Sequence, residues 1–263
     1  MKLYFKVPPE ADGMLLRGFL RRCSVSTDLS RAVKFRGSGF FADGAPVLAN
    51  RRVEAGQVIS FELPPEGEGV APQDDIPVDV VYEDAFALVV EKPPHLAVHP
   101  TMNYPLDTLA NGYAAWALRQ GRSPVFRPVN RIDKDTSGLL VVAKDDATHI
   151  GLSQQMAVHS VERAYRTIVY GGFAQDEGFV ESNLGRSKTD RKKMAVYPAS
   201  EPHTKYAYTG YKVLERFGGF TLLECRLKTG RTHQIRVHMA SIRHPVARIR
   251  KSCFPLSRLN AMP

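Results

Sequence analysis

The first quarter of the chain carries two apolar stripes at helical spacing, over residues 15–20 and 29–35. Apolar residues that recur three and four positions apart lie on one face of a helix, so the pattern predicts two short helices. The strand and turn signals that follow are a strand from Phe40, a turn at Asp43-Gly44 and a closing strand at 58–63. Residues 1–62 are therefore predicted to form a small α/β domain.

A change of composition separates this domain from the rest of the chain. Residues 63–77 are rich in proline, glycine and acidic residues and carry no periodic pattern, which is typical of a linker. Beyond the linker, apolar and polar positions alternate at 78–82 and again at 87–91. This alternation predicts a β-hairpin at the start of a larger domain, residues 78–263.

Strand patterns outnumber helical patterns in this larger domain. The predicted helices begin at Leu109 after a cap at Asp107 or Thr108, run from a cap at Asp146 to about residue 159, and follow a cap at Thr232. The predicted strands are 139–143, 161–170, 206–214 and 221–227. Many strands with few helices predict the α+β class, with a mixed, mainly antiparallel sheet and flanking helices.

Composition and charge indicate the kind of partner that the protein binds and the cellular compartment in which it works. The 263 residues carry 36 basic and 27 acidic side chains, so the net charge is 36 − 27 = +9, which favours phosphate-rich partners, although the charge can also serve solubility alone. Cys23, Cys225 and Cys253 show no paired spacing, so we expect free thiols in a reducing cytoplasm. The start has no apolar segment typical of a signal peptide, and no run approaches the ~18 apolar residues of a membrane span.

The chemically most distinctive stretch is a polar loop that leads into the apolar strand 139–143. The loop, residues 130–137, contains two carboxylates, Asp133 and Asp135, and is followed by Gly138. A carboxylate held at the end of a buried strand is well placed for catalysis. The alternative is an ordinary loop with solvated ion pairs, and local sequence alone does not separate the two.

This loop resembles the catalytic motif of the RluA/RluD-type RNA pseudouridine synthases, and four other segments resemble further motifs of that family in the same order. The five segments are 91–100, 130–144, 162–171, 185–194 and 229–239. The resemblance covers residues 76–246 and implies a pseudouridine synthase fold. It also implies an enzyme that isomerises uridine to pseudouridine in structured RNA without a cofactor or metal.

The resemblance assigns three residues to catalysis. It makes Asp133 the catalytic carboxylate, with Asp135 at a variable position of the motif, and it pairs Asp133 with the guanidinium of Arg236. An arginine would keep a partly buried aspartate ionised. Tyr165 matches the family's active-site tyrosine, whose ring can stack on the target uracil. The alternatives are phosphate binding for Arg236 and a plain core position for Tyr165.

Several basic residues are expected to bind RNA. By resemblance, Arg131 can occupy the space that a flipped-out base leaves. The two N-terminal helices resemble the alpha-L RNA-binding motif, with solvated arginines on amphipathic helices as the alternative. The expected RNA-binding residues are Arg17, Arg21, Arg31, Lys34, Arg131, Lys188, Arg191, Lys192, Lys193, Arg231 and His233. His233 and His238 are five residues apart, which is not the spacing of a zinc pair.

The expected substrate is large-subunit ribosomal RNA, with transfer RNA as an open alternative, and the expected state is a monomer without membrane attachment. After residue 246 the sequence departs from the family, because the usual Gly-Asp-x-x-Tyr-Gly segment is replaced by an unrelated one. A frameshift, a truncation or a divergent lineage would each explain the change. The alternative function is therefore a catalytically impaired RNA-binding or ribosome-assembly protein. A metal hydrolase would need a ligand cluster that the sequence lacks.

Overall fold

The computed structural model describes residues 1–158 and 160–247, and it combines helices with antiparallel sheets, which confirms the α+β class. The chain divides into two compact units between Ser160 and Val161, and each unit is described by itself. No helix in the described residues combines the length and the apolar character that a membrane span requires. The departure from the family pattern after residue 246 lies, apart from Ala247, outside the described residues.

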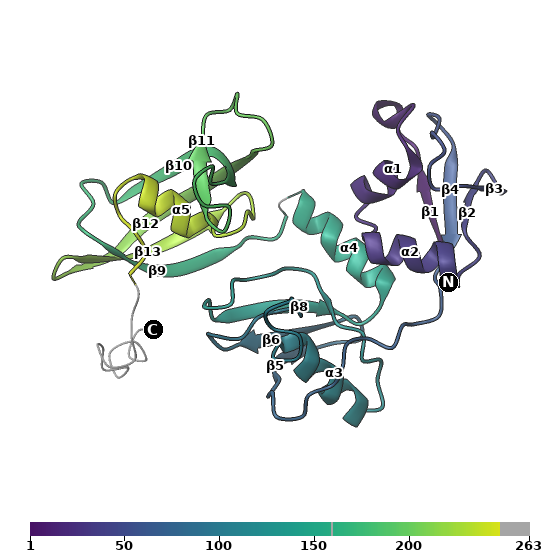
Figure 1. Cartoon of the computed structure of the whole chain (residues 1–263), viewed down its shortest axis with the longest axis horizontal. Coiled ribbons are helices and arrows are strands. Elements are labelled where there is room, and N and C mark those ends of the chain that lie inside the picture. The colour runs from purple at the N-terminus through teal and green to yellow at the C-terminus, as the bar shows by residue number, and fades with distance from the viewer. Residues whose placement is uncertain (159, 248–263) are drawn as a thin grey trace. The chain divides into compact units, whose positions relative to one another are not determined.

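The first unit begins with a sheet of four strands in the order β1-β4-β2-β3, with two helices on one of its faces (Figure 1). Its elements are β1 (Lys2–Lys6), the 3-10 turn η1 (Pro9–Ala11), α1 (Leu16–Arg22), α2 (Thr27–Arg36), β2 (Phe40–Ala42), β3 (Ala45–Val47) and β4 (Val58–Glu62). The apolar stripes of α1 and α2 meet the inner face of the sheet in one buried cluster. Both predicted helices and the closing strand are confirmed.

The hairpin between β2 and β3 follows directly from its sequence. Asp43 has φ 48° and Gly44 has φ 83°, so both loop residues adopt the left-handed conformation that a two-residue hairpin turn requires. Two details differ from expectation. The strand β1 was not predicted, and Phe35, counted in the apolar stripe of α2, is 73% exposed.

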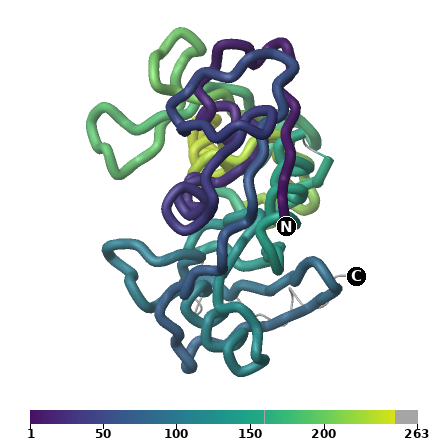
Figure 2. The backbone as a smooth tube through the Cα atoms, turned by 90° about the vertical axis from the view of Figure 1, so that its right-hand side faces the viewer, coloured from purple at the N-terminus to yellow at the C-terminus, as the bar shows by residue number. Residues whose placement is uncertain are grey.

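The second sheet of the first unit has the order β5-β6-β8-β7, and α3 packs against it (Figures 1 and 2). Its elements are β5 (Asp79–Glu83), β6 (Ala87–Lys92), α3 (Leu109–Arg119), β7 (Arg127–Pro128), β8 (Gly138–Ala143) and α4 (Asp146–Ala157). The predicted hairpin of β5 and β6 is confirmed. The predicted cap at Asp146 is wrong, because the Asp145 side chain accepts from Thr148 N and caps α4, while Asp146 pairs with Arg127.

The second unit is a five-stranded antiparallel sheet in the order β11-β10-β12-β13-β9, covered on one face by α5 (Figure 1). Its elements are β9 (Ala164–Tyr170), β10 (Glu177–Arg186), β11 (Met194–Tyr197), β12 (Lys205–Phe217), β13 (Phe220–Leu227) and α5 (Gln234–Ser241). The strands β10 and β11 were missed in the sequence. The predicted cap at Thr232 is wrong, because His233 is the first residue before the helix and its side chain makes no capping bond.

The stretch between β4 and β5 contains no helix or strand. The domain boundaries at residues 62 and 77 stay a prediction.

Candidate active site

The loop that carries Asp133 is fastened to the strand on which it ends. The Asn130 side chain accepts a hydrogen bond from Val141 N (2.9 Å) and donates one to Leu139 O (3.2 Å), which ties the start of the loop to β8. Ile132 packs against the buried cluster under the sheet. Asp133, half-buried, lies one residue beyond this anchor, so the fold restricts where its carboxylate can point.

A buried lysine at the end of β6 holds the other side of this loop. Lys92 is 0% exposed, and its register partner in β8 is Gly138. Its Nζ donates to three carbonyl oxygens, Pro93 O (2.7 Å), Leu96 O (2.8 Å) and Lys134 O (2.9 Å). An ammonium group has three N–H donors, so all of them are used. The bond to Lys134 O fixes the backbone next to Asp133.

The charge of Lys92 is coupled to the two carboxylates of the loop. Burial lowers the pKa of Lys92 to about 8, and the negative charges of Asp135 and then Asp133 oppose that fall. At neutral pH the ammonium is therefore mostly charged. The loop therefore has a buried positive charge beside its two carboxylates.

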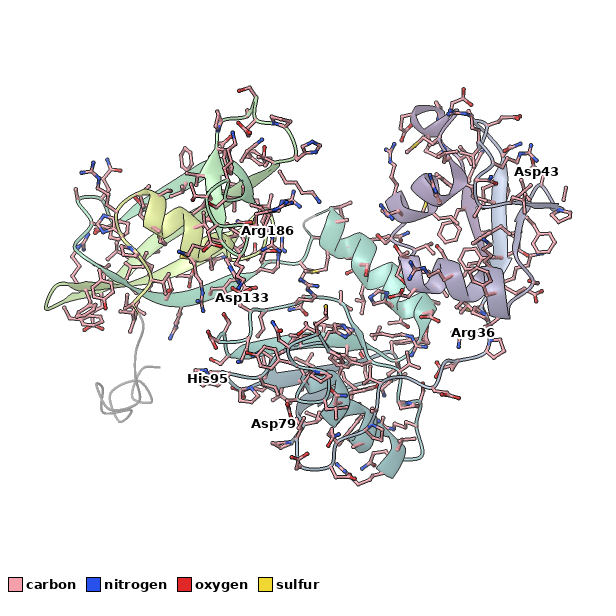
Figure 3. All side chains as sticks on the ribbon, in the orientation of Figure 1. Arg36, Asp43, Asp79, His95, Asp133 and Arg186 are labelled. Atoms are coloured by element: carbon pink, nitrogen blue, oxygen red, sulfur yellow. The ribbon has the colours of Figure 1, made fainter. Side chains whose placement is uncertain are left out.

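The two candidate carboxylates differ in their surroundings. Asp135 is exposed, and its Oδ1 lies 3.2 Å from Nδ1 of His95, a residue in the left-handed conformation with φ 67°. Lys134 turns its Nζ to the Tyr104 hydroxyl (2.8 Å). Figure 3 labels His95 and Asp133. The more sheltered position of Asp133 favours it over Asp135 as the reactive group.

Arg131 is exposed at the start of the same loop and lies close to His99. Burial lowers the pKa of His99, and the positive charge of Arg131 lowers it further. The His99 ring packs edge-on against Phe126, with the ring centres 5.3 Å apart. Both effects favour the neutral form of His99, and the Arg131 side chain itself is exposed.

Tyr165 lies on β9 in the second unit, opposite Cys225 of β13. It is half-buried and packs against the cluster that contains Cys225, Leu223 and Met239. Ile235, in the first turn of α5, packs against the same cluster. The structure therefore places Tyr165 and the start of α5 around one core.

Three predicted site residues surround the start of α5. Arg231 donates from Nε to Tyr206 O (2.9 Å), His233 has a left-handed backbone with φ 54°, and Arg236 is exposed in the first helical turn. His233 precedes the helix and does not have helical dihedrals, so it does not share a helical face with Arg236 despite the three-residue spacing. The ion pair of Arg236 with Asp133 stays a prediction.

The remaining basic residues lie on exposed surfaces of their own units. The segment with Lys188, Arg191, Lys192 and Lys193 connects β10 to β11, where Lys188 pairs with Glu201 (2.8 Å). Arg17, Arg21, Arg31 and Lys34 project from α1 and α2, and Arg31 pairs with Asp28 (3.7 Å). Their role in RNA binding stays a prediction.

Sequence reasoning missed Lys92, Gln234 and His238 as structural supports of the site. The signal for Lys92 was present, because a charged residue that closes the run Ala-Leu-Val-Val-Glu-Lys sits where the strand is buried. In the described residues no group of three or more His, Cys, Asp or Glu side chains has the geometry of a metal site.

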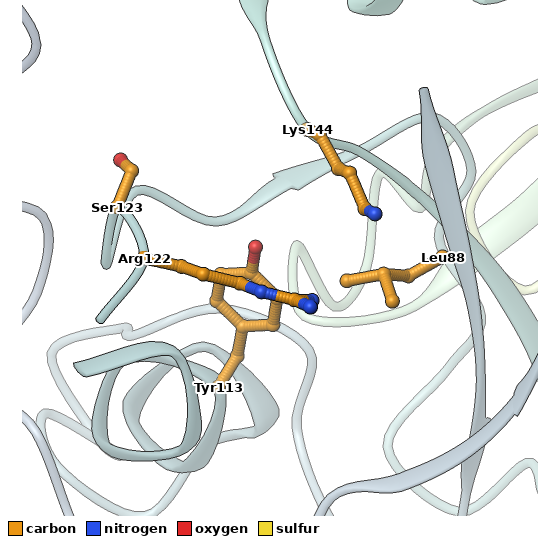
Figure 4. A pocket seen from close by; sticks show the side chains of 5 residues that line it. All are labelled: Leu88, Tyr113, Arg122, Ser123 and Lys144. Atoms are coloured by element: carbon orange, nitrogen blue, oxygen red, sulfur yellow. The ribbon is translucent and has the colours of Figure 1, made fainter. Parts of the chain in front are cut away.

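A cavity of about 370 Å³ in the first unit lies apart from these residues (Figure 4). It is lined by Leu88, Tyr113, Arg122, Ser123 and Lys144. Glu83 pairs with both Arg122 Nη1 (2.5 Å) and Lys144 Nζ (2.7 Å), so the cations of the cavity are already engaged. None of the predicted site residues lines it.

Comparison with known proteins places the chain in a family. Residues 87–241 match the RNA pseudouridylate synthase family. An RNA pseudouridine synthase of Bacillus subtilis, described as uncharacterised, is 43% identical over 209 residues, which are 78% of this chain and 67% of that protein. The ribosomal large subunit pseudouridine synthase D of Zymomonas mobilis is 48% identical over 174 residues, 65% of this chain and 54% of that protein. The chain thus spans between about half and two thirds of these two relatives.

Solved structures show the same fold at lower identity. Human RNA pseudouridylate synthase domain containing 1 has a TM-score of 0.54 at 24% identity, over 67% of this chain and 70% of that one. Human RNA pseudouridylate synthase domain containing 4 has a TM-score of 0.53 at 22% identity, over 64% and 66%. With its sequence matched across both units, the chain belongs to the RNA pseudouridylate synthase family.

Proposed function

We propose that this chain isomerises specific uridines to pseudouridine in structured RNA, and that the substrate is large-subunit ribosomal RNA. The family match supports the reaction. The name of the Zymomonas mobilis relative, and that of a Xylella fastidiosa relative 36% identical over 91% of this chain, support the substrate. Transfer RNA is the alternative substrate. We propose that the protein acts as a monomer in the cytoplasm.

The observation that carries the proposal is the fixed position of Asp133. In the reaction the bond between uracil N1 and the sugar breaks, the ring turns, and a bond forms from carbon 5 to the same sugar carbon. The proton leaves carbon 5 and N1 gains one, so no oxidant or reductant is needed. A carboxylate that attacks the sugar or removes its proton is the group required. Asp133 lies on a loop that Lys92 and Asn130 hold from two sides.

We assign supporting roles to three other residues. Tyr165 supplies a ring for stacking on uracil, and Arg236 supplies the permanent positive charge that keeps a carboxylate ionised. Arg131 occupies the space of the extruded base, since a planar guanidinium can replace part of the lost stacking. The basic faces of α1 and α2 and the basic loop before β11 contact RNA phosphates.

The direct test is tritium release from RNA labelled at carbon 5 of uridine, with ribosomal and transfer RNA offered separately. Asp133→Asn removes the charge but keeps the shape of the side chain, so we expect release to fall below detection. Asp135→Asn is the matched control two residues away. It removes an exposed carboxylate whose partner is His95, and it should keep activity within about threefold, because surface ion pairs contribute little.

Equal loss in both variants would contradict the assignment of Asp133. Absence of release by the parent chain on either RNA, together with salt-sensitive RNA binding, would favour the rival function of an RNA-binding or ribosome-assembly protein.

A further inference from the structure

A buried side-chain amide joins three parts of the second unit. Gln234, at the start of α5, is 3% exposed. Its Oε1 accepts from Thr229 Oγ1 (2.8 Å) and from Arg231 N (2.9 Å), and its Nε2 donates to Tyr208 O (2.9 Å) and Thr209 Oγ1 (3.0 Å). A side-chain amide offers two donors and two acceptor lone pairs, so all four are used. The amide thus connects α5 both to the loop before it and to β12.

A second set of bonds connects this amide to His238 and to β10. Thr209 Oγ1 lies 2.9 Å from His238 Nδ1, and His238 Nε2 lies 3.1 Å from Ser182 Oγ. Burial lowers the pKa of His238 to about 4, so the ring is neutral at physiological pH. Thr209 Oγ1 also accepts from Gln234 Nε2, so the ring and the amide share this hydroxyl. The two backbone partners of Gln234 set the orientation of its amide, because Arg231 N can only donate and Tyr208 O can only accept.

The loop that the amide holds carries predicted RNA-binding residues and leads into Arg236. Its backbone is strained, because His233 adopts a left-handed conformation that a non-glycine residue keeps only when the surroundings enforce it. Gln234 N donates to Arg231 O (3.1 Å), and Arg231 Nε donates to Tyr206 O (2.9 Å). Without the amide, Thr229 Oγ1 and Arg231 N would lose their acceptor, and the links of Gln234 to Tyr208 O and Thr209 Oγ1 of β12 would be lost as well.

We propose that Gln234 is a positioning residue whose amide holds residues 229–233 in the one conformation that presents Arg231 and Arg236. This inference rests on the proposed function, in which the two arginines serve RNA binding and the carboxylate. Gln234 itself is buried and acts through its neighbours.

The test compares two changes at Thr229, whose hydroxyl donates to Gln234 Oε1 and accepts from Tyr208 N (3.0 Å). Thr229→Val keeps the shape and removes both bonds, whereas Thr229→Ser keeps the hydroxyl. Thr221→Val is the matched control on β13. It removes a threonine hydroxyl that is also buried and is bonded to Gly171 O (2.7 Å), away from the loop. All variants are assayed below their melting temperatures.

We expect Thr229→Val to lower kcat/KM for tritium release by about 10- to 100-fold, because a small displacement of positioning groups has effects of that size. Thr229→Ser should restore activity to within about threefold of the parent protein. Thr221→Val should retain the parent activity even if it loses as much stability as Thr229→Val. Equal activities of the valine and serine variants at residue 229 would overturn the inference, and so would an equal loss in Thr221→Val.

A second measurement does not depend on activity. Hydrogen exchange of the Arg231 amide reports the bond to Gln234 Oε1 directly. Gln234→Met keeps the length of the side chain and removes the oxygen that accepts from Arg231 N, and we expect it to speed exchange at Arg231 more than at β9 amides. Unchanged exchange would refute the inference even if the parent chain proves inactive, whereas an inactive parent with fast exchange in the variant would refute only the proposed function.

Discussion

Lys92 shows how one buried side chain links the electrostatics of the site to folding. Its pKa is lowered from 10.5 to about 8, chiefly by burial, while Asp135 and Asp133 favour the charged form. Between pH 8 and pH 10.5 the folded protein has released this proton while the unfolded chain still binds it. The contribution of Lys92 to the free energy of unfolding therefore rises with pH across that window and is constant below it.

Lys92→Met removes the titrating ammonium group, so a comparison with the parent protein measures the pH-dependent contribution of Lys92 to stability. We expect the unfolding free energy of the parent to rise, relative to that of the variant, by up to about 3 kcal/mol from pH 8 to pH 10.5. Urea unfolding across that range measures the difference. Lys205→Met, which removes an exposed ammonium, is the control. A constant difference between parent and Lys92→Met would show that Lys92 has an ordinary pKa.

For single residues, the sequence predicted which side chains are candidates for catalysis better than it predicted their backbone geometry. The motifs pointed to Asp133 and Tyr165, and the structure finds the first on an anchored loop and the second beside a buried cluster. The left-handed backbone of His233 was not predictable from the local sequence, since the neighbouring Gln234 bonds to Tyr208 of β12, 26 residues away along the chain. Residues that act through such long-range contacts leave no local pattern.

At the scale of elements, helices with a clear apolar stripe were predicted and strands with mixed faces were missed. On β10 the inward positions include Ser182, which bonds His238, and the outward positions include the exposed Phe179. On β1 the exposed Tyr4 likewise interrupts the alternation. A polar residue on the inner face or an aromatic one on the outer face hides the two-residue period on which strand prediction depends.

The cap of α4 offers a test at this scale. Two consecutive aspartates stand at the start of the helix, and the one that caps it is Asp145, whose carboxylate accepts from Thr148 N (2.8 Å) and Thr148 Oγ1 (2.9 Å). Asp145→Ala should lower the free energy of unfolding by about 1 kcal/mol, because two helix-terminal donors lose their acceptor. Thermal unfolding measures this. Gln155→Ala, at an exposed position of the same helix, should change stability by less than about 0.5 kcal/mol.

At the scale of the whole molecule, composition predicted the kind of partner but could not say where it binds. Residues 1–160 carry 17 basic and 19 acidic side chains, and residues 161–263 carry 19 and 8, so the net charge of +9 comes from the second unit. Most of the basic groups predicted to bind RNA are exposed. The order of the motifs predicted the family, which the comparisons confirm. The division of the chain between Ser160 and Val161 was not predicted.

Salt dependence tests the proposed RNA contacts of the basic loop. Each phosphate contact adds about 0.7 to 0.9 to the slope of log affinity against log salt concentration. The double change Lys192→Gln and Lys193→Gln should therefore lower the slope by up to about 1.8 in filter-binding or fluorescence titrations with ribosomal RNA fragments. Lys212→Gln, which removes a lysine already paired with Glu177 (3.0 Å), is the control. An unchanged slope in the double variant would remove this loop from the RNA surface.

The pairing of Tyr165 with Cys225 across β9 and β13 has a practical consequence for spectroscopy. Burial raises the pKa of the Cys225 thiol to about 12, so its sulfur keeps its hydrogen and is shielded from alkylating reagents and oxidants. The S–H stretching vibration absorbs in an infrared window that is nearly free of other protein bands. A difference spectrum against Cys225→Ser would therefore give an intrinsic probe of the electric field beside Tyr165, without any label attached to the protein.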